Sequence, residues 1–341
     1  MECKGKVAST WHCRAVAAWE RWRLAGLFPI PRFPSGSRRD AGAPRPPATC
    51  VLPPAISTFT VWRMKVSIVT PSFRSSGWLK LCIASVADQQ GVEVEHIVQD
   101  SQSDDGTQDW LPKDSRVKAF IEKDKGMYDA INRGWKRATG EVLAYLNCDE
   151  QYLPGGLQAV EGFFRANPEV DVVFADTIVV DAKGEFISCR KSLVPQRNVM
   201  WVYNPVISSS IFIHRRVLDQ HGLFFDTQWR DLGDKVWNLE FLKKGLRMAV
   251  LRRYTSVFTD TGENMNLKPN AIRERETVMS MAPKWVQRFR QPLLLSHRIR
   301  AACHGLYWEK PLTYEIYTKT SPDRRVSFHI EKPTGIWKSR H

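Results

Sequence analysis

The sequence lacks an apolar run of about 18 residues, the minimum for a helix that crosses a bilayer. No CxxC pair occurs among the seven cysteines, which are scattered at positions 3, 13, 50, 82, 148, 189 and 303. This odd, scattered set predicts neither a disulfide framework nor a zinc site, and it favours a reducing compartment. Charges and tryptophans interrupt the apolar segment near the N-terminus, which therefore does not resemble a secretory signal peptide. We expect a cytoplasmic protein.

The sequence also has no excess of acidic residues, since its net charge is +14. The basic excess lies at the two ends of the chain. Residues 1–63 contain ten Lys and Arg against three Asp and Glu, and residues 283–341 contain twelve against four. Residues 64–282 hold the remaining 28 basic and 29 acidic residues and are close to neutral. These shifts predict an N-terminal extension (1–63), a central domain (64–282) and a basic, amphipathic C-terminal region (283–341).

The extension is predicted to be disordered, because residues 29–54 contain eight prolines together with Gly, Ser and Arg. The pattern changes at Met64, where a strand-like segment begins, so residues 1–63 are interpreted as an upstream extension without function. The alternative is a basic tail that contacts anionic lipid or nucleic acid. No nucleic-acid motif occurs in it, so we predict no nucleic-acid partner.

From Met64 onward short apolar runs alternate with helical patterns, which is typical of βαβ units and a largely parallel sheet. The fold class predicted is therefore α/β. Strands are expected over residues 66–70, 94–100, 116–122 and 142–146, followed by a hairpin over 171–188 and one or two strands over 247–258. Helices are expected over residues 76–90, 128–140 (ending at Gly140), 155–170, a short stretch after 213, and 231–245 (ending at Gly245).

Polar side chains follow three of the predicted parallel strands. Thr70, Pro71 and Ser72 end the first strand, residues 99–107 (QDSQSDDGT) follow the second, and residues 147–150 (NCDE) follow the fourth. In an open parallel sheet, ligands bind beyond the carboxyl ends of the strands. The first two segments are also good turn sequences and could serve only as turns. Together the three indicate a binding site at one edge of the sheet.

The NCDE segment is the least easily explained as a turn, because a five-residue apolar strand carries its carboxylates toward the domain centre. Unpaired buried carboxylates are costly, whereas a Mg²⁺ or Mn²⁺ ion would be bound by them. Cys148 points to the opposite face of the strand from its neighbours and is predicted to be a small buried residue rather than a ligand.

Three segments, VSIVTPSF, QDSQSDDGT and EKDKGMYDAINRGWKRATGEVLAYLNCDE, resemble the catalytic core of family 2 glycosyltransferases. Their order, spacing and residue types match over roughly residues 64–255. The resemblance implies a GT-A fold, a nucleotide-diphospho-sugar transferase fold with a mostly parallel sheet flanked by helices. It also implies an inverting enzyme.

The resemblance further implies a nucleotide site. Thr70, Pro71 and Ser72 should line the pocket, and Asp100 should hydrogen-bond the base, with Ser103 and Asp105 in the same loop. A second nucleotide-side segment should comprise Lys125, Gly126, Asp129 and Asn132, where a cation and a helix N-terminus could meet the diphosphate.

The NCDE segment occupies the position of the family's DxD motif, with Asn147 in place of the first acidic residue. By the resemblance, Asp149 should bind Mn²⁺ or Mg²⁺, with Glu150 as a supporting ligand or ribose contact, and Asp234 should be the general base. Asp231 is the competing candidate. Either aspartate could instead cap the helix that follows, and Asp176 is assigned no role.

The function predicted is transfer of a sugar from a UDP- or GDP-linked donor to a hydroxyl of a polysaccharide or lipid-linked acceptor, as in polysaccharide biosynthesis. The alternatives are a sugar nucleotidyltransferase, for which TPSFRSSGWLK is a poor phosphate loop, and a non-catalytic nucleotide-sugar-binding relative, motivated by Asn147. Aromatic and Leu residues among the Arg and Lys of 283–341 could contact the inner face of the membrane as a peripheral surface. Equally, the region could only complete the fold.

Overall fold

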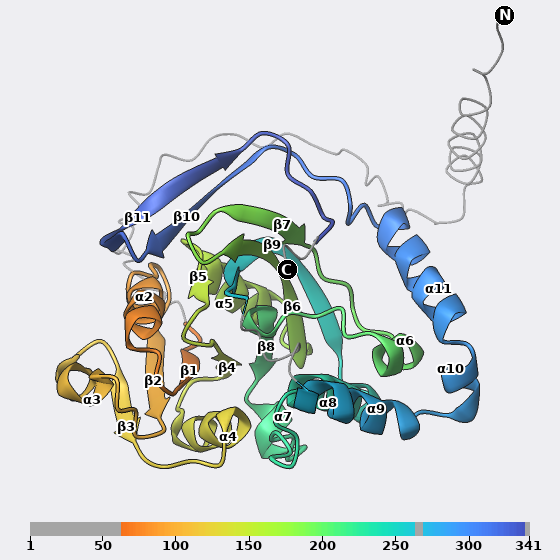
Figure 1. Cartoon of the computed structure of the whole chain (residues 1–341), viewed down its shortest axis with the longest axis horizontal. Helices are drawn as coiled ribbons and strands as arrows, with labels where there is room; N and C mark the ends of the chain where they lie inside the picture. Colours follow the sequence, from red (N-terminus) through yellow and green to blue (C-terminus); the bar gives the residue numbers. More distant parts are fainter. Residues whose placement is uncertain (1–62, 263–268, 338–341) are drawn as a thin grey trace, which may run out of the picture. The chain divides into compact units, whose positions relative to one another are not determined.

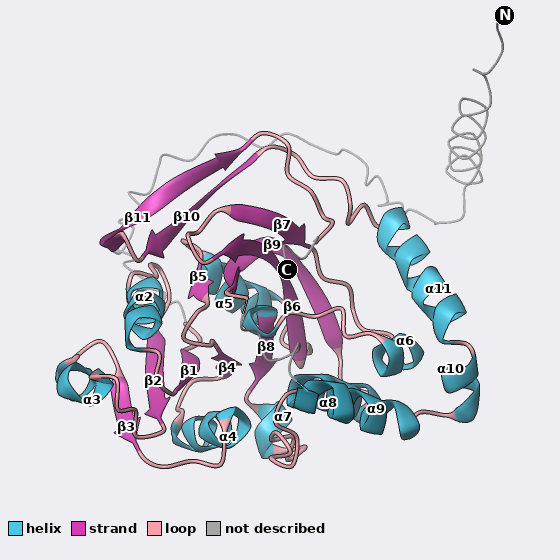
Figure 2. Ribbon diagram, in the orientation of Figure 1, coloured by secondary structure: helices cyan, strands magenta, loops and turns pink. Residues whose placement is uncertain are grey.

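The computed structural model describes residues 63–262 and 269–337, so the expectations for residues 1–62 lie outside it. A curved nine-stranded sheet with helices on both faces forms the centre (Figures 1 and 2). Within the described residues, no helix is both long and apolar enough to cross a membrane.

One half of the sheet is entirely parallel. Its strands lie in the order β3-β2-β1-β4, and their bounds are Val66–Ser72 (β1), Val94–Asp100 (β2), Lys118–Ile121 (β3) and Val142–Tyr145 (β4). Because all four run the same way, the residues that follow β1, β2 and β4 emerge at one edge. The predicted clustering of the strand ends therefore has a structural basis.

The other half of the sheet is mixed. After β4 the order continues β8-β6-β9-β5, with β7 paired to β6. Their bounds are Gln151–Tyr152 (β5), Val172–Asp181 (β6), Phe186–Arg190 (β7), Ile211–His214 (β8) and Met248–Asp260 (β9). β6 pairs with β9 in parallel and with β7 and β8 in antiparallel register.

Alternation along the strands divides the core into two layers. Val66 and Ile68 of β1 pack with helices α2 (Ser76–Ala87) and α5 (Gly156–Ala166) on one face. Val69 of the same strand packs on the other face with α4 (Met127–Arg137), α7 (Arg216–Asp219) and α8 (Gly233–Lys244). Both faces are covered by helices, which is why the parallel strands read as nearly continuous apolar runs.

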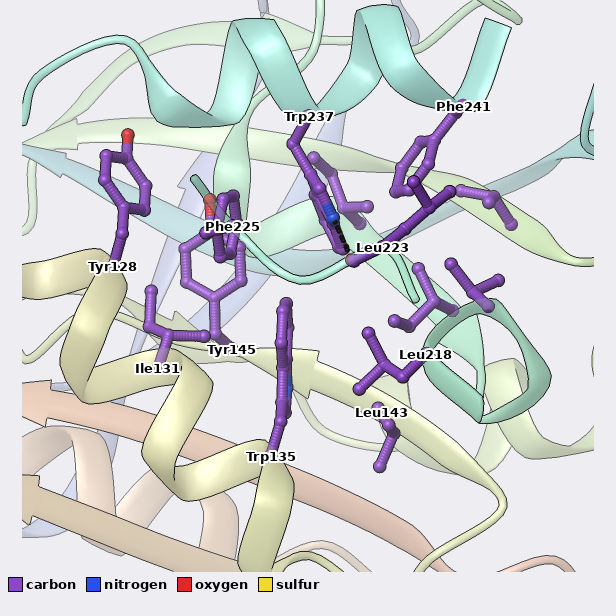
Figure 3. Close-up of a cluster of buried hydrophobic side chains, with 14 of the residues drawn as sticks. Tyr128, Ile131, Trp135, Leu143, Tyr145, Leu218, Leu223, Phe225, Trp237 and Phe241 are labelled. Atoms are coloured by element: carbon purple, nitrogen blue, oxygen red, sulfur yellow. Dashed lines mark hydrogen bonds between the residues drawn. The ribbon is translucent and has the colours of Figure 1, made fainter. Parts of the chain in front are cut away.

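An aromatic cluster joins α4 to α8 on the second face (Figure 3). The ring of Trp135 stacks on both Phe225 and Trp237, at centroid distances of 5.3 and 5.2 Å, and those two rings contact each other at 4.5 Å. Tyr145, from the end of β4, meets Phe225 edge-on at 5.5 Å. The indole N–H of Trp237 donates to the Leu223 carbonyl at 2.6 Å, so the polar atom of this buried ring is satisfied.

The C-terminal residues add two further structures to this core. Helices α9 (Pro269–Ser280), α10 (Lys284–Arg288) and α11 (Arg290–Cys303) follow the sheet, with α10 and α11 against α6 (Arg197–Val202). A hairpin of β10 (Leu312–Thr318) and β11 (Ser321–Ile330) then returns to α2. There the Arg325 guanidinium forms a two-point ion pair with Asp88, at 2.6 and 2.7 Å.

The predicted strands and main helices are present, with small changes of boundary. β1 extends through Ser72, and residues 248–260 form a single strand. The helix predicted to end at Gly140 ends at Arg137. Gly140 instead lies against β1, where its N–H donates to Ser67 Oγ at 2.8 Å and a side-chain Cβ would come within 2.6 Å of the Lys65 carbonyl oxygen. Residues 111–113 and 208–210 form short 3₁₀ turns (η1 and η2), and residues 107–110 form a single helical turn (α3).

Gly233, the first residue of α8, provides a test of the contact between α4 and α8. A Cβ at this position would lie 2.5 Å from Cε2 of the buried Tyr128 ring. We expect Gly233→Ala to lower the free energy of unfolding by about 1–3 kcal/mol, because the ring or the helix must move. Urea unfolding measures the change.

Gly162, inside α5, is the matched control, since a Cβ at this position would have no atom within 4 Å. Gly162→Ala should raise the free energy of unfolding by roughly 0.5–1 kcal/mol. Equal unfolding midpoints for Gly233→Ala and the unmodified protein would contradict a tight contact at Tyr128.

Candidate active site

Asp100, the last residue of β2, organises the loops beyond β1 and β2. Its carboxylate is fully buried. It accepts hydrogen bonds from Ser72 Oγ at 2.8 Å, from Ser103 Oγ at 2.7 Å and from the Ser103 N–H at 2.8 Å. Oδ1 accepts only the last of these, so it has capacity for one more donor. The structure thus brings three of the predicted nucleotide-site residues together.

The loops after β1 and β2 each contain a residue in the left-handed backbone conformation, which is unfavourable for residues other than glycine. In the described part of the chain, Arg74 (φ 50°) and Gln102 (φ 57°) are the only non-glycine residues with positive φ. Each follows a strand that ends at Asp100 or Ser72, and the Arg74 N–H donates to Ser103 Oγ at 2.8 Å. Conformations of this kind are concentrated at functional sites, where surrounding bonds hold them.

Asp105 fixes the start of α2. Its carboxylate accepts hydrogen bonds from the Ser76 N–H at 2.8 Å and from Thr107 Oγ1 at 2.6 Å. Burial acts to raise the pKa of Asp105, but the hydrogen bonds from Thr107 and Ser76 prevail and lower it. This predicted site residue therefore anchors the loop to the helix.

Thr70 and Pro71 lie within β1 rather than after it. The Thr70 hydroxyl is buried on the α2 face, 2.9 Å from His96 Nε2 and 3.6 Å from Cys82 Sγ. Its side chain is thus engaged inside the domain, away from the strand ends. The Pro71 carbonyl accepts a hydrogen bond from the buried Cys148 thiol at 3.2 Å. Cys148 is the small interior residue that its alternation predicts.

The carboxylates after β4 have different environments. Glu150 is buried and accepts hydrogen bonds from Ser208 Oγ and from the Asn147 N–H, both at 2.9 Å. Burial, followed by the charge of Asp149, raises the pKa of Glu150 to about 8. Asp149 is partly exposed and makes no ion pair among the described residues, and burial raises its pKa too. The Asn147 Oδ1 atom is buried and has no hydrogen-bond partner among residues 63–262 and 269–337.

Asp234 lies in the first turn of α8, opposite this strand end. Its carboxylate accepts a hydrogen bond from Asn204 Nδ2 at 3.0 Å, and its own N–H donates to the Tyr128 hydroxyl at 3.2 Å. Burial raises the pKa of Asp234 to about 6, against the lowering effect of the Lys235 N–H. A carboxyl group with such a pKa takes up protons near neutral pH, which suits a general base.

A cleft of about 280 Å³ adjoins Asp234 through Tyr128. Its lining comes from two segments, residues 125–129 and residues 227–231. Lys125 is exposed there, while Asp129 accepts hydrogen bonds from the Lys125 N–H and from Arg133. Asn132 does not line the cleft. Both sides of its amide bond the backbone of Phe225, at 2.8 and 2.9 Å.

Several α/β families bind ligands at the carboxyl edge of a parallel sheet, and comparison with known proteins shows which of them this chain is similar to. The family model described as glycosyl transferase family 2 matches residues 67–223. Residues 67–223 are a family 2 glycosyltransferase domain. The resemblance predicted from the sequence is confirmed over these residues.

Individual proteins similar to this glycosyltransferase domain are distant. An uncharacterized glycosyltransferase of Nostoc is 25% identical over 186 residues, covering 50% of this chain and 57% of its own length. A Campylobacter jejuni protein named GalNAc(5)-diNAcBac-PP-undecaprenol beta-1,3-glucosyltransferase is 29% identical over 121 residues, covering 34% and 38%. The chain therefore spans less than two thirds of the length of either relative.

A solved structure of residues 1–349 of S. aureus TarS in complex with UDP-GlcNAc shares the fold. Its TM-score is 0.52 at 16% identity, and the match covers 70% of this chain and 73% of that one. The GT-A type of α/β fold predicted from the sequence is confirmed.

The candidate site also contains residues that the sequence patterns did not single out. Tyr145 is the clearest case. Its hydroxyl is buried, and its pKa is raised by burial and then by the charge of Asp234. Glu150 acts on it in the same direction. Both acidic groups therefore act on Tyr145. The sequence could have indicated Tyr145, because it ends a predicted strand and alternation places its side chain on the same face of the sheet as Leu143.

Glu274 of α9 is a second such residue, and no sequence pattern pointed to it. Its carboxylate accepts hydrogen bonds from three consecutive N–H groups, those of Arg230, Asp231 and Leu232, at 2.8 to 2.9 Å. Asp231, the competing base, is also bonded by Asn270 at 2.7 Å. The loop that leads into Asp234 is thus held in place by α9.

The raised pKa of Asp234 predicts that this carboxylate destabilises the folded domain at high pH. The folded pKa of about 6 lies above the usual value of 3.8. The unfolded chain therefore loses the proton first, and the penalty is absent below pH 3.8 and complete above pH 6. We expect Asp234→Asn to raise Tm at pH 8 by a few degrees, from about 1–2 kcal/mol after allowance for partial exposure.

Calorimetry at pH 8 and at pH 4.5 measures this effect. Asp231→Asn, in the same loop, is the control and should leave Tm unchanged or lower it, because it disturbs the bond from Asn270. An equal rise in Tm for Asp234→Asn at both pH values would exclude the charge as the cause.

Proposed function

We propose that the protein is an inverting glycosyltransferase that moves a sugar from a UDP- or GDP-linked donor to an acceptor hydroxyl. One observation supports this more than any other. Asp149 follows β4 and Asp234 lies in the first turn of α8, and the charges of Asp234 and of Glu150, next to Asp149, both act on the buried Tyr145 at the end of β4. A metal-binding carboxylate for the leaving diphosphate and a base for the acceptor are the two requirements of a single displacement.

The donor nucleotide is proposed to bind beyond β1 and β2. Asp100 offers the free acceptor position of its Oδ1 to the base, and the serines that bond its carboxylate keep it in place. Pro71 and Asp105 shape the two loops around it. Thr70 contributes through its buried side chain, which supports the strand.

Lys125 supplies the positive charge for the diphosphate, next to the N-terminus of α4. It is exposed, and its side chain has no ion pair among the described residues. Asp129 accepts the Lys125 N–H and so fixes the turn, which passes through Gly126 at φ 125°. Asn132 acts further away, holding Phe225 and the segment that carries the far wall of the cleft.

The residues after β4 fit a hard divalent cation. Asp149 provides a carboxylate without an ion pair in the described chain, and Asn147 Oδ1 is an unpartnered oxygen in the same turn. Asp149 would hold Mn²⁺ or Mg²⁺, with Glu150 supporting the turn through its bond to the Asn147 N–H. Once bound, the ion would stabilise negative charge on the departing diphosphate.

Asp234 is proposed to accept the proton of the acceptor hydroxyl. The hydroxyl oxygen forms the new bond to the anomeric carbon as the bond to the diphosphate breaks, and the proton goes to the Asp234 carboxylate. Attack from the face opposite the leaving group inverts the anomeric centre. Asn204 and the Lys235 N–H hold the carboxylate in orientation throughout.

The acceptor is proposed to be a polysaccharide or a lipid-linked glycan. A relative is named for action on an undecaprenol-linked glycan, which motivates the lipid-linked class. The TarS structure contains UDP-GlcNAc, which makes that compound the first donor to test.

The test is release of UDP or GDP from a panel of nucleotide sugars by the full chain, with Mn²⁺ and with EDTA. Turnover should need the metal, and Asp149→Ala and Asp234→Asn should each lower it about 100-fold or more. Asp231→Asn is the matched control and should retain turnover within about threefold. Release of pyrophosphate from a sugar phosphate and a nucleotide would indicate a nucleotidyltransferase instead, and binding without any turnover would indicate a non-catalytic relative.

The pH dependence of the same turnover distinguishes the two acidic groups. Asp234 must be ionised to accept a proton, so the rate should fall tenfold per pH unit below about pH 6, its pKa, and level off above it. A fall that begins near pH 8 would instead identify Glu150 as the group that must ionise. Rates measured from pH 5 to 9 in the unmodified protein and in Glu150→Gln separate these cases.

A further inference from the structure

Exposed apolar side chains are concentrated in one part of the described chain. Of its ten exposed large apolar residues, seven lie between positions 281 and 308: Met281, Trp285, Phe289, Leu295, Ile299, Tyr307 and Trp308. They lie on and around α10 and α11, along one edge of the molecule in Figure 1. We call these seven residues, together with the basic side chains described next, the basic-aromatic face.

Its charge is of one sign. Residues 277–308 contain no Asp or Glu. Lys284, Arg288, Arg290 and Arg298 are all exposed. None of the four has an ion pair or a side-chain hydrogen bond within the described residues, whereas nine arginines elsewhere in the described chain form ion pairs. Unpaired cations interleaved with aromatic side chains are unusual on a surface that meets only water.

The opposite side of these helices is fixed to the domain. Ala301 of α11 is buried with Leu193 and Leu306. Arg300 donates to the Val194 carbonyl at 3.0 Å, and His297 packs against Tyr203 at a centroid distance of 5.4 Å. The exposed side therefore cannot turn inward to bury its apolar groups.

We propose that the basic-aromatic face lies on the surface of an anionic phospholipid bilayer. Lys and Arg near such a surface are attracted by its negative potential, and Trp, Phe and Leu side chains insert at the level of the headgroups. A second copy of the chain is a poorer occupant. A two-fold contact through this face would set Arg288, Arg290 and Arg298 against the same residues of the partner, with no acidic side chain to neutralise them.

The basic-aromatic face lies close to the proposed catalytic groups, so its contact with a bilayer would bring those groups near the membrane surface. Helix α6 packs against α10 and α11 on one side and against α8 on the other. The Trp201 carbonyl of α6 accepts a hydrogen bond from Lys235, and Asn204, just beyond α6, binds the Asp234 carboxylate. One short helix therefore separates the bilayer from the base. This step rests on the proposed function, and it implies a lipid-linked acceptor reached from the membrane surface.

Sedimentation of the full chain with vesicles tests the contact. Binding should be strong to vesicles of equal parts phosphatidylglycerol and phosphatidylcholine, weak to phosphatidylcholine alone, and largely lost at high salt. The triple variant Arg288→Gln, Arg290→Gln, Arg298→Gln should lower affinity about fivefold per charge, or roughly 100-fold. Trp285→Ala with Trp308→Ala should lower it about tenfold.

A matched triple variant, Lys113→Gln, Lys244→Gln, Arg324→Gln, removes the same charge from exposed positions elsewhere and should bind almost as the unmodified protein does. Equal losses in the two triple variants would overturn the face as the site. So would a dimer, seen by analytical ultracentrifugation, that the face variant abolishes without change in vesicle binding. Donor hydrolysis without vesicles should be the same in all variants. If the unmodified protein binds vesicles but does not hydrolyse any donor, the result counts against the proposed function alone. If it hydrolyses a donor but does not bind vesicles, the result counts against the membrane contact alone.

Discussion

The stacked rings of Trp135, Phe225 and Trp237 are the contact on which the geometry of the site depends. They connect a helix that follows the third strand to one that begins about a hundred residues later, and Tyr145 joins the same cluster from the sheet (Figure 3). Because dense aromatic packing leaves little freedom, the first turn of α8 has one position relative to β4. Asp234 is placed by apolar contacts that it does not itself make.

The polar groups at the edge of the sheet differ in how well they are satisfied. Asp100 and Asp105 receive several short hydrogen bonds and hold loops in place. Asp149 and Asp234, in contrast, are kept in surroundings that disfavour their charge. Groups of the second kind lower the stability of the fold, and active sites tolerate that cost where a ligand or a proton will relieve it. In the proposed function, Asp100 and Asp105 support the site, and Asp149 and Asp234 are the groups that take part in the reaction.

Much of this architecture could be predicted from the sequence, because its signals are local. Apolar runs and turn residues located β1, β2 and β4, and the parallel arrangement then placed their ends together. Alternation along β1 places the Thr70 side chain on the same face of the sheet as Val66 and Ile68, which pack inward, so its burial could have been predicted. Contacts between distant segments carried no such signal. Asn132 binds the backbone of Phe225 across 93 positions, and Glu274 reaches back 42 to 44 residues. Pairings of this kind follow from tertiary packing, which no local pattern encodes.

The hydrogen bonds from the loop before Asp234 to Glu274 determine how long a fragment must be to keep that loop in place. The family match stops at residue 223, before Asp234, and the carboxylate that holds the base's loop lies in α9, still further along. A fragment cut to the matched domain would keep the nucleotide-side loops but would lose both β9 and Asp234, the proposed base. A fragment ending after β9 would keep the base but leave three backbone N–H groups in its loop without their acceptor. The unit that the proposed function requires therefore extends beyond residues 67–223 and includes α9.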